Sequence, residues 1–256
     1  MRGRIMSKVG ALKMLCSHPD LIRTSALKFK SVDKNVIYEE EIDGATVRLS
    51  EMVPTFGTKG GSAYAAELYD EKWLDGLNSS PKLDYLVQYV EDFLEQNDEN
   101  KVVIFATYVD MLDKIEERLG AERCRKYSGK LDSKTKEANK IAFNTDPSIR
   151  VLISSDAGGY GVDLPAANLL INYDLPWSSG TAVQRNGRIK RASSTWPSIV
   201  ITDIIIKGSI EERQWESLQQ KSAVANAVID GEGIDAEGNM ELSVGSLKQF
   251  LQLSIV

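Results

Sequence analysis

The sequence predicts an α/β protein with a mostly parallel sheet flanked by helices. Short segments of strand length recur along the chain, at 102–107, 123–127, 151–154, 169–173 and 199–206, and all but the second are rich in apolar residues. Amphipathic helical patterns at 109–119 and 133–143 separate several of them. Continuous apolar strands are typical of a sheet that is buried on both faces. In such sheets ligands bind beyond the carboxyl ends of the strands, so functional residues are expected there.

The segment before the first predicted strand begins with a helix. A helical pattern covers 5–18, although Lys13 and Ser17 interrupt its apolar positions. It ends before Pro19, because proline disfavours helical backbone in the residue ahead of it. From about 24 to 61 the pattern is irregular and predicts a linker or an insertion.

Capping signals predict two further helices. Ser80 followed by Pro81 marks the start of a helix that runs to about 96. Ser209, with Glu212 three residues later, predicts a long helix at about 210–228. One more short helix is expected at 243–253. We therefore expect three parts, with boundaries at 1–79, 80–206 and 207–256.

The composition is that of a soluble intracellular protein. The net charge of −6 argues against coating nucleic acid by bulk charge, so any such contact must be local. The two cysteines lack metal-ligand spacing, and no apolar run reaches the roughly 20 residues that span a bilayer. The acidic loop 230–239 lacks the ligand spacing of an EF-hand. We expect no membrane segment, no secretion signal and no metal site.

A glycine-rich segment follows the strand at 151–154. Gly158, Gly159 and Gly161 permit close approach of the backbone to a phosphate or a sugar. Asp163 is suited to accept a hydrogen bond from a ribose hydroxyl, and Ser155 to donate one to a nucleic-acid phosphate. Such segments are also common in ordinary turns, so the glycines alone decide nothing.

An arginine-rich segment follows the next strand. If 181–190 is helical, Gln184, Arg188 and Arg191 lie along one stripe. A guanidinium group has a permanent charge and donates two hydrogen bonds to phosphate oxygens, which suits it to a triphosphate. The alternative is a solvated basic helix face. The neighbouring glycine segment favours the phosphate-binding interpretation.

The order of these segments resembles one known family. The chain is similar to the C-terminal RecA-like lobe of superfamily-two helicases, specifically the Swi/Snf type of DNA-dependent ATPases. The resemblance is carried by Val102–Tyr108, Tyr127–Gly129, Ser154–Leu164, Asn172–Trp177, the Gln-x-x-Gly-Arg-x-x-Arg run of 184–191, and Gly208–Arg213. It implies a RecA-like three-layer fold, with 80–206 as the lobe and 207–256 as a helical extension packed on it.

Two upstream segments extend the resemblance. Leu15–Leu21 is similar to the family's Cys-x-His-Pro segment between its two lobes, and Ser79–Leu83 to its Ser-x-Lys-Leu segment. The single histidine, His18, is therefore interpreted as an interlobe packing residue. The chain departs from the family pattern at Asp163, where the family often has Asn, and at Arg185, where it often has Ala. It departs again at Ala192-Ser193, commonly Gly-Gln.

The resemblance also implies roles for individual residues. Arg188 and Arg191 would be arginine fingers on ATP, and Gln184 would position the nucleotide or the attacking water. Gly161 and Asp163 would couple the nucleotide site to the site that tracks the DNA strand, and together with Gly159 they would be the cofactor-binding residues.

Nucleic-acid contacts are implied as well. Ser155 and Thr107 would contact the phosphate backbone of double-stranded DNA. Tyr160 is a candidate for stacking on a base, and Trp177 is interpreted mainly as a packing residue.

Half of the expected nucleotide site has no counterpart in the sequence. It contains neither GxxxxGK[ST], the phosphate-binding loop, nor an Asp-Glu-x-His segment to hold Mg²⁺. We expect ATP and Mg²⁺ to be held mainly by an N-terminal RecA-like lobe of the same protein, which is the expected partner. The chain alone should hydrolyse little ATP, although the parent protein would be an ATP hydrolase.

Two alternatives remain from the sequence. Asp163 and Arg185 would suit an RNA helicase lobe of the DEAD-box type, whereas the spacing from Trp177 to Gln184 favours the DNA-dependent family. The second alternative is a lobe without catalysis that binds nucleic acid or a protein partner. The intact arginines weigh against it.

Overall fold

A computed structural model shows how these segments fold. It describes residues 2–31, 35–42, 45–52, 62–156, 162–190, 192–194 and 196–229, and of residues 2–4, 31, 35–52 and 220–229 only the backbone. The helix expected at 243–253 and the acidic loop 230–239 lie outside these ranges.

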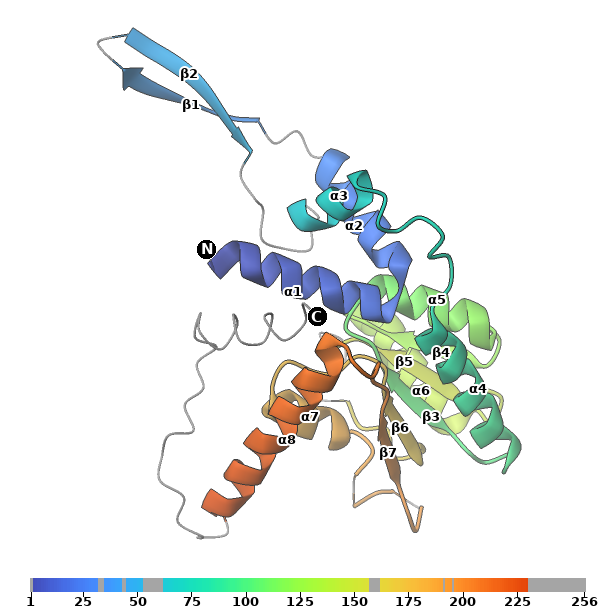
Figure 1. Ribbon diagram of the computed structural model, residues 1–256. Coiled ribbons are helices and arrows are strands. Elements are labelled where there is room, and N and C mark those ends of the chain that lie inside the picture. Colours follow the sequence, from blue (N-terminus) through green and yellow to red (C-terminus); the bar gives the residue numbers. More distant parts are fainter. Residues whose placement is uncertain are drawn as a thin grey trace.

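The centre of the protein is a five-stranded parallel sheet, which confirms the predicted RecA-like α/β class (Figure 1). Its strands lie in the order β4-β5-β3-β6-β7. Their bounds are β3 Val102–Phe105, β4 Cys124–Tyr127, β5 Val151–Ser154, β6 Leu169–Asn172 and β7 Val200–Asp203. Each overlaps the strand expected from the sequence. For β3, β5 and β6 the reason is that their apolar runs are too short and too continuous for amphipathic helices.

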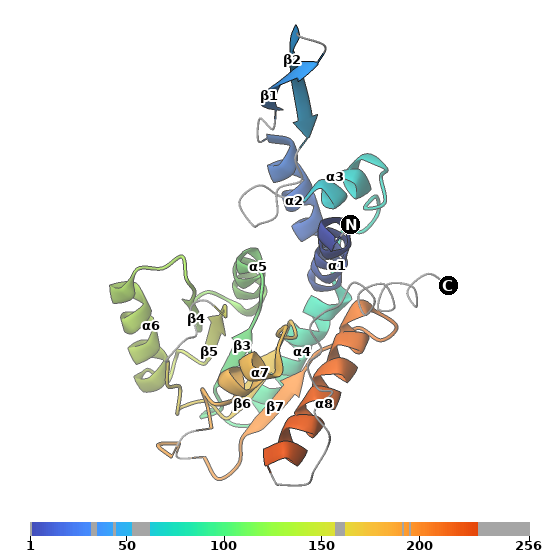
Figure 2. The same cartoon turned by 90° about the vertical axis from the view of Figure 1, so that its left-hand side faces the viewer.

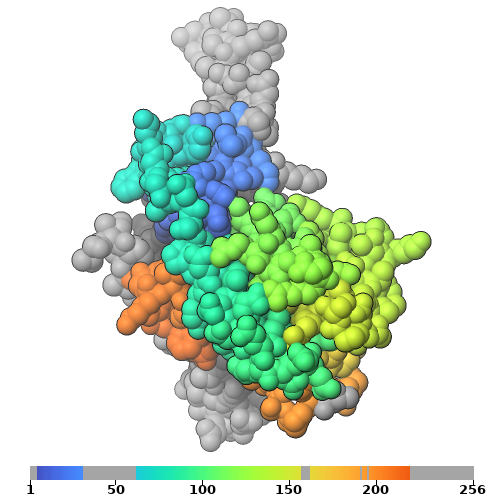
Figure 3. Space-filling view, turned by 90° about the vertical axis from the view of Figure 1, so that its right-hand side faces the viewer, coloured from blue at the N-terminus to red at the C-terminus, as the bar shows by residue number. Residues whose placement is uncertain are grey.

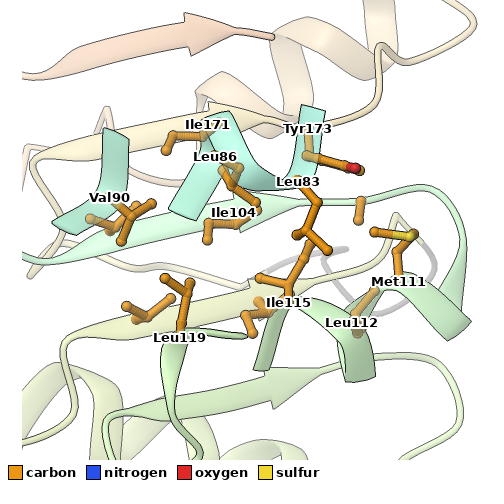
Figure 4. Close-up of a cluster of buried hydrophobic side chains, with 14 of the residues drawn as sticks. Leu83, Leu86, Val90, Ile104, Met111, Leu112, Ile115, Leu119, Ile171 and Tyr173 are labelled. Carbon is orange, nitrogen blue, oxygen red and sulfur yellow. The ribbon is translucent and has the colours of Figure 1, made fainter. Parts of the chain in front are cut away.

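Helices α4 (Pro81–Glu95) and α5 (Val109–Leu119) cover one face of the sheet. Leu86 of α4 and Ile115 of α5 pack against Ile104 and Ile171 of the central strands (Figure 4). These four side chains are fully buried. Burial of one such side chain contributes about 1.5–3 kcal/mol, so this layer is a main source of stability.

Helix α6 (Ser133–Thr145) covers the opposite face. Its Phe143 packs with Val103, Leu152 and Leu170, which alternate along their strands with the residues that face α4 and α5. Ile189 belongs to the same cluster and follows helix α7 (Ser179–Asn186). The arginine-rich segment is therefore tied to the sheet through an apolar contact.

Three N-terminal helices form a separate small core. Helices α1 (Arg2–Ser17), α2 (Pro19–Ser31) and α3 (Ala63–Asp70) pack through Ala11, Ile22, Ala26 and Ala65, and Leu74 from the turn after α3 joins them. Figure 2 shows this group above the sheet, and in the space-filling view it adjoins the surface of α4 and α5 (Figure 3).

The expectation of an irregular segment from 24 to 61 was wrong for its described parts. Helix α2 continues to Ser31, and β1 (Asn35–Ile42) pairs with β2 (Ala45–Met52) as an antiparallel hairpin that projects from the body (Figures 1 and 2). The sequence Asp43-Gly44 between the strands is a hairpin signal that the glutamate run 39–41 obscured.

Helix α8 (Ile210–Ile229) lies beside the β7 edge, whereas α6 lies beside the β4 edge (Figure 2). It begins as the sequence predicted. Glu212 accepts a hydrogen bond from the Gly208 N–H at 2.7 Å, and the Ser209 hydroxyl accepts one from the Glu211 N–H. Gly208 has a φ of 73°, a conformation that favours glycine. Within the described ranges, no helix is long and apolar enough to cross a bilayer.

The strand order creates a switch point between β3 and β6. After β3 the chain passes through α5 to β4 on one side, whereas after β6 it passes through α7 to β7 on the other side. Loops that diverge in this way leave a crevice at the carboxyl ends of the two strands, where α/β proteins bind ligands. Thr107 and Asp174 lie at these two ends.

Candidate nucleotide and nucleic-acid site

Asp174 joins the two strands of the switch point. It is fully buried, and its Oδ2 accepts a hydrogen bond from the Thr107 N–H at 2.9 Å. Its Oδ1 accepts one from the Ser17 hydroxyl at the end of α1. The carboxylate therefore fixes the backbone of Thr107 and connects it to the N-terminal helices.

Two hydroxyl groups near this point have no partner. The Thr107 Oγ1 and the Ser155 Oγ are both buried and make no hydrogen bond in the described part of the chain. Ser155 is 2% exposed, and its backbone N–H donates to the Tyr127 carbonyl at 3.2 Å. A buried polar atom without a partner costs about 1–3 kcal/mol, which marks both hydroxyls as candidates for an external ligand.

Arg185 binds the exit of β5 to the end of β6. Its Nε and Nη2 donate to the two carboxylate oxygens of Asp156, at 2.6 and 2.8 Å. Its Nη1 donates to Asn172 Oδ1 at 3.0 Å and to the Asp174 carbonyl at 2.6 Å. The guanidinium also lies over the Phe105 ring, 5.3 Å from its centroid. This departure from the family pattern thus has a defined structural partner.

The expected single helical stripe at 181–190 was wrong. Helix α7 ends at Asn186, and a turn at Gly187 follows. A side chain at Gly187 would meet the Val183 carbonyl at 3.3 Å, which explains a glycine there. As a result, Gln184 is exposed on α7, whereas Arg188 lies beyond it and is 9% exposed.

The Arg188 guanidinium has no hydrogen-bond or ion-pair partner among the described residues. Its backbone is fixed on both sides, because its N–H donates to the Arg185 carbonyl and its carbonyl accepts from the Leu164 N–H. The five N–H donors of the guanidinium are thus not engaged by the described residues. Arg188 therefore fits an anionic ligand that enters from outside this lobe.

Several expected site residues lie outside the described residues. These are Gly159, Tyr160, Gly161 and Arg191, so their predicted roles stay predictions. Asp163 is described and exposed, and its carbonyl accepts a hydrogen bond from Asn144 at 3.4 Å. No group of three or more potential metal ligands occurs in the described part of the chain.

Helix α1 reaches the same end of the sheet. The Lys13 ammonium donates to the Leu175 carbonyl at 3.1 Å and lies 4.0 Å from the centroid of the Trp177 ring. Burial lowers the pKa of Lys13 from 10.5 to about 8, against the opposing effect of the Asp174 carboxylate. Trp177 contacts α1 in this way but remains exposed on its other side.

His18 lies at the joint between α1 and α2. It is buried, and its Nδ1 accepts a hydrogen bond from the Asp20 N–H at 3.1 Å, which caps α2. Because Nδ1 acts as an acceptor, the neutral ring is the form that fits. Burial lowers the pKa of His18 below 6.5, and the nearby Lys114 acts in the same direction.

Comparison with known proteins identifies the lobe. Residues 81–193 match the helicase conserved C-terminal domain. The DNA repair and recombination protein RAD54-like of Homo sapiens is 28% identical over 252 residues, which cover 97% of this chain and 30% of that protein. The chromatin-remodeling ATPase INO80 of Kluyveromyces lactis is 27% identical over 209 residues, 78% of this chain and 13% of that protein.

Residues 81–193 are a helicase C-terminal domain, and the chain as a whole is similar to Swi/Snf-type ATPases. The DNA repair and recombination protein RAD54B of Gallus gallus is also similar, with 29% identity over 87% of this chain and 23% of that protein. The lobe thus spans less than a third of the length of such relatives. The solved C-terminal part of the Fun30 ATPase domain shares the fold, with a TM-score of 0.51 at 23% identity over 62% of this chain and 55% of that one.

Sequence reasoning missed four residues of this helicase lobe's site. Lys13 and Ser17 interrupt the apolar pattern of α1, and that interruption was the available signal. Arg185 was noticed only as a departure from the family pattern. Asp174 was noticed only as part of the Asn172–Trp177 segment that carries the resemblance, and no role was assigned to it.

Proposed function

We propose that this lobe is the second motor lobe of an ATP-dependent translocase or helicase that double-stranded DNA stimulates. The observation that supports it best is the pair of buried hydroxyls of Thr107 and Ser155, which lie at the carboxyl ends of neighbouring strands and have no partner among the described residues. Residues 1–79 join this lobe to a first, N-terminal lobe in the proposal, and residues 207–256 extend it.

The two hydroxyls contact phosphates of the DNA backbone in this proposal. A hydroxyl donates to a phosphate oxygen without reading the base, as suits a protein that moves along DNA of any sequence. Asp174 holds the Thr107 backbone in place, so the contact is arranged before DNA binds. The acidic net charge of the chain is compatible with this, because the contact is local.

The nucleotide contacts come from the arginine segment. Arg188, with Arg191, donates to the γ-phosphate of ATP when the lobes close, and Gln184 positions the nucleotide or its attacking water. Gly159, Gly161 and Asp163 line the nucleotide side of the same edge, and Tyr160 stacks on nucleic acid. Arg188 is 9% exposed and its guanidinium has no partner among the described residues, which supports its assignment as an arginine finger.

Mg²⁺ and the phosphate cradle belong to the first lobe in this proposal. The ion neutralises charge on the transferred phosphoryl group when it is bound. The described residues of this lobe contain no metal-ligand group, and their part is to orient and stabilise phosphate oxygens through hydrogen bonds. We therefore expect little ATP hydrolysis from the 256-residue chain.

Binding of a fluorescent DNA duplex to the purified chain tests the backbone contacts. Ser155→Ala and Thr107→Val should each weaken binding about threefold to tenfold, since each removes one hydrogen bond to a phosphate. Neither should lower the free energy of unfolding much, because neither hydroxyl has a partner among the described residues.

Ser148→Ala is the matched control. The Ser148 hydroxyl is exposed, bonds to Asp146 and precedes the amino end of β5. It should leave DNA affinity unchanged. Unchanged affinity in both site variants would contradict the proposed contacts. Tighter binding of duplex RNA than of duplex DNA would favour the DEAD-box alternative.

The arginine-finger role is tested in a protein that carries both lobes. Arg188→Ala should lower kcat for ATP by a factor on the order of 10³ while changing the KM much less. Gln184→Ala, at an exposed position, should have a smaller effect on kcat. An equal loss of ATP binding and of hydrolysis in Arg188→Ala would argue against the finger role.

A further inference from the structure

We propose that the ion pair of Asp156 and Arg185 positions helix α7 relative to the exit of β5. We call this pair the Asp156–Arg185 clamp. It sets the spacing between Ser155, which precedes Asp156, and Arg188, which follows Arg185 by one turn. The inference rests on the proposed function for its effect on DNA, but the clamp itself is a property of the free lobe.

The geometry of the guanidinium supports a fixed position. Four hydrogen bonds use four of the five donors that an arginine side chain has. The two bonds to Asp156 are bidentate, an arrangement that fixes orientation as well as distance. The Arg185 side chain is 2% exposed, so its donors are shielded from solvent, whereas the Asp156 carboxylate is 31% exposed.

Arg185 also provides the polar connection between α7 and the sheet. Among the described residues, every side-chain hydrogen bond from α7 to the sheet or to its strand exits comes from Arg185. The Ser178 cap and the bond between the Ser178 and Thr181 hydroxyls stay within the start of the helix. Loss of the two hydrogen bonds to Asp156 should therefore let α7 move relative to β5. The hydrogen bonds from Arg185 to the end of β6 would remain.

Whether removal of the Asp156 charge weakens or strengthens DNA binding distinguishes a positioning role from a purely electrostatic one. Asp156 adjoins Ser155, so its carboxylate is a negative charge next to a proposed phosphate contact. Removal of that charge alone should strengthen DNA binding, since like charges repel. If the clamp positions Ser155 and Arg188, the same removal should weaken binding instead.

Asp156→Asn in the full chain tests the clamp. Asparagine keeps the size and one acceptor but loses the bidentate pair. Glu91→Gln is the matched control, because Glu91 makes a bidentate pair with Arg123 at the amino end of the sheet. The two carboxylate side chains have similar exposure, 31% for Asp156 and 32% for Glu91.

Amide hydrogen exchange of the free chain is the first measurement. In Asp156→Asn the amides of residues 183–187 should exchange about tenfold faster, because α7 opens more often when its link to β5 is lost. Glu91→Gln should leave these amides unchanged. Unchanged exchange at 183–187 in Asp156→Asn would overturn the clamp, whatever the DNA results.

DNA affinity is the second measurement. Asp156→Asn should bind duplex DNA at least about threefold more weakly than the unmodified chain, whereas Glu91→Gln should bind equally. Faster exchange with equal or tighter DNA binding would overturn the functional half of the inference. If the unmodified chain binds no duplex, the proposed DNA contact fails, and the exchange measurement still decides the clamp.

Discussion

The Lys82 ammonium lies 2.5 Å from a carboxylate oxygen of Glu211, in an ion pair whose side chains are 1% and 0% exposed. Lys82 begins α4, and Glu211 begins α8, 129 residues later. The second Glu211 oxygen accepts a hydrogen bond from the Ile206 N–H at 3.2 Å, and the Tyr173 ring lies beside the ammonium. Two helix starts that are distant in sequence are thus joined in the interior.

Glu211→Gln should lower the free energy of unfolding by about 3–5 kcal/mol, because it leaves the Lys82 ammonium buried and uncompensated. Urea unfolding of the full chain measures the loss. The double variant Lys82→Met, Glu211→Gln should recover part of it, since no buried charge remains.

The pair of Arg118 and Asp84 is the control for the buried pair. Both side chains are about half exposed. Asp84→Asn should change the free energy of unfolding by less than about 1 kcal/mol. A similar loss for Asp84→Asn and Glu211→Gln would show that burial is not the cause.

Acid should destabilise the protein through His18. Its pKa is lower in the folded protein than in the unfolded chain, so the unfolded state binds the proton more readily. The resulting stability is fully present above about pH 6.5 and declines as the pH falls through the folded-state pKa. Protonation of Nδ1 also removes the acceptor for the Asp20 N–H.

His18→Asn isolates this effect, because asparagine also caps helices and does not titrate. Thermal unfolding at several pH values between 7.5 and 5 should show a smaller decline for the variant than for the unmodified chain. Equal declines would mean that His18 does not control acid sensitivity.

Alkaline pH should stabilise the protein through Lys13. Its pKa is about 8 in the folded protein against 10.5 in the reference state, so the unfolded chain binds more protons in that window. Its contribution to stability therefore rises as the pH increases from about 8 to 10.5, by at most about 3 kcal/mol.

Lys13→Met should remove this rise. Urea unfolding of both proteins at pH 7.5, 8.5 and 9.5 gives their free energies of unfolding. With increasing pH, the free energy of the unmodified chain should rise relative to that of Lys13→Met. A constant difference would show that Lys13 titrates alike in the folded and unfolded states.

Ser80→Ala should cost more stability than loss of an ordinary cap. The Ser80 hydroxyl accepts from the Leu83 N–H and donates to the Ser17 carbonyl at 2.8 Å, so it both caps α4 and holds α1. We expect a loss of about 2 kcal/mol in urea unfolding. Ser178→Ala, which removes only the cap of α7, should cost about half as much.

The strands and the main helices could be predicted because their signals are local. The apolar run at 151–154 and the Ser80-Pro81 cap each contain the information for the element that they start. The hairpin at 35–52 was missed because three consecutive glutamates interrupt the alternation of apolar and polar residues that is typical of a strand. The helix expected at 181–190 is shorter than predicted. It ends at Asn186, and Gly187 caps it ahead of Arg188.

The sequence by itself determined the α/β class, the strand positions and the edge of the sheet where the predicted site residues Thr107 and Ser155 lie. These follow from periodicity, capping and the parallel sheet rule, which depend on neighbours along the chain. Only the tertiary structure decided that Arg185 binds Asp156, that Asp174 holds Thr107, and that Lys82 meets Glu211. Each pair joins residues far apart in sequence, and burial in the folded protein gives these polar contacts their strength.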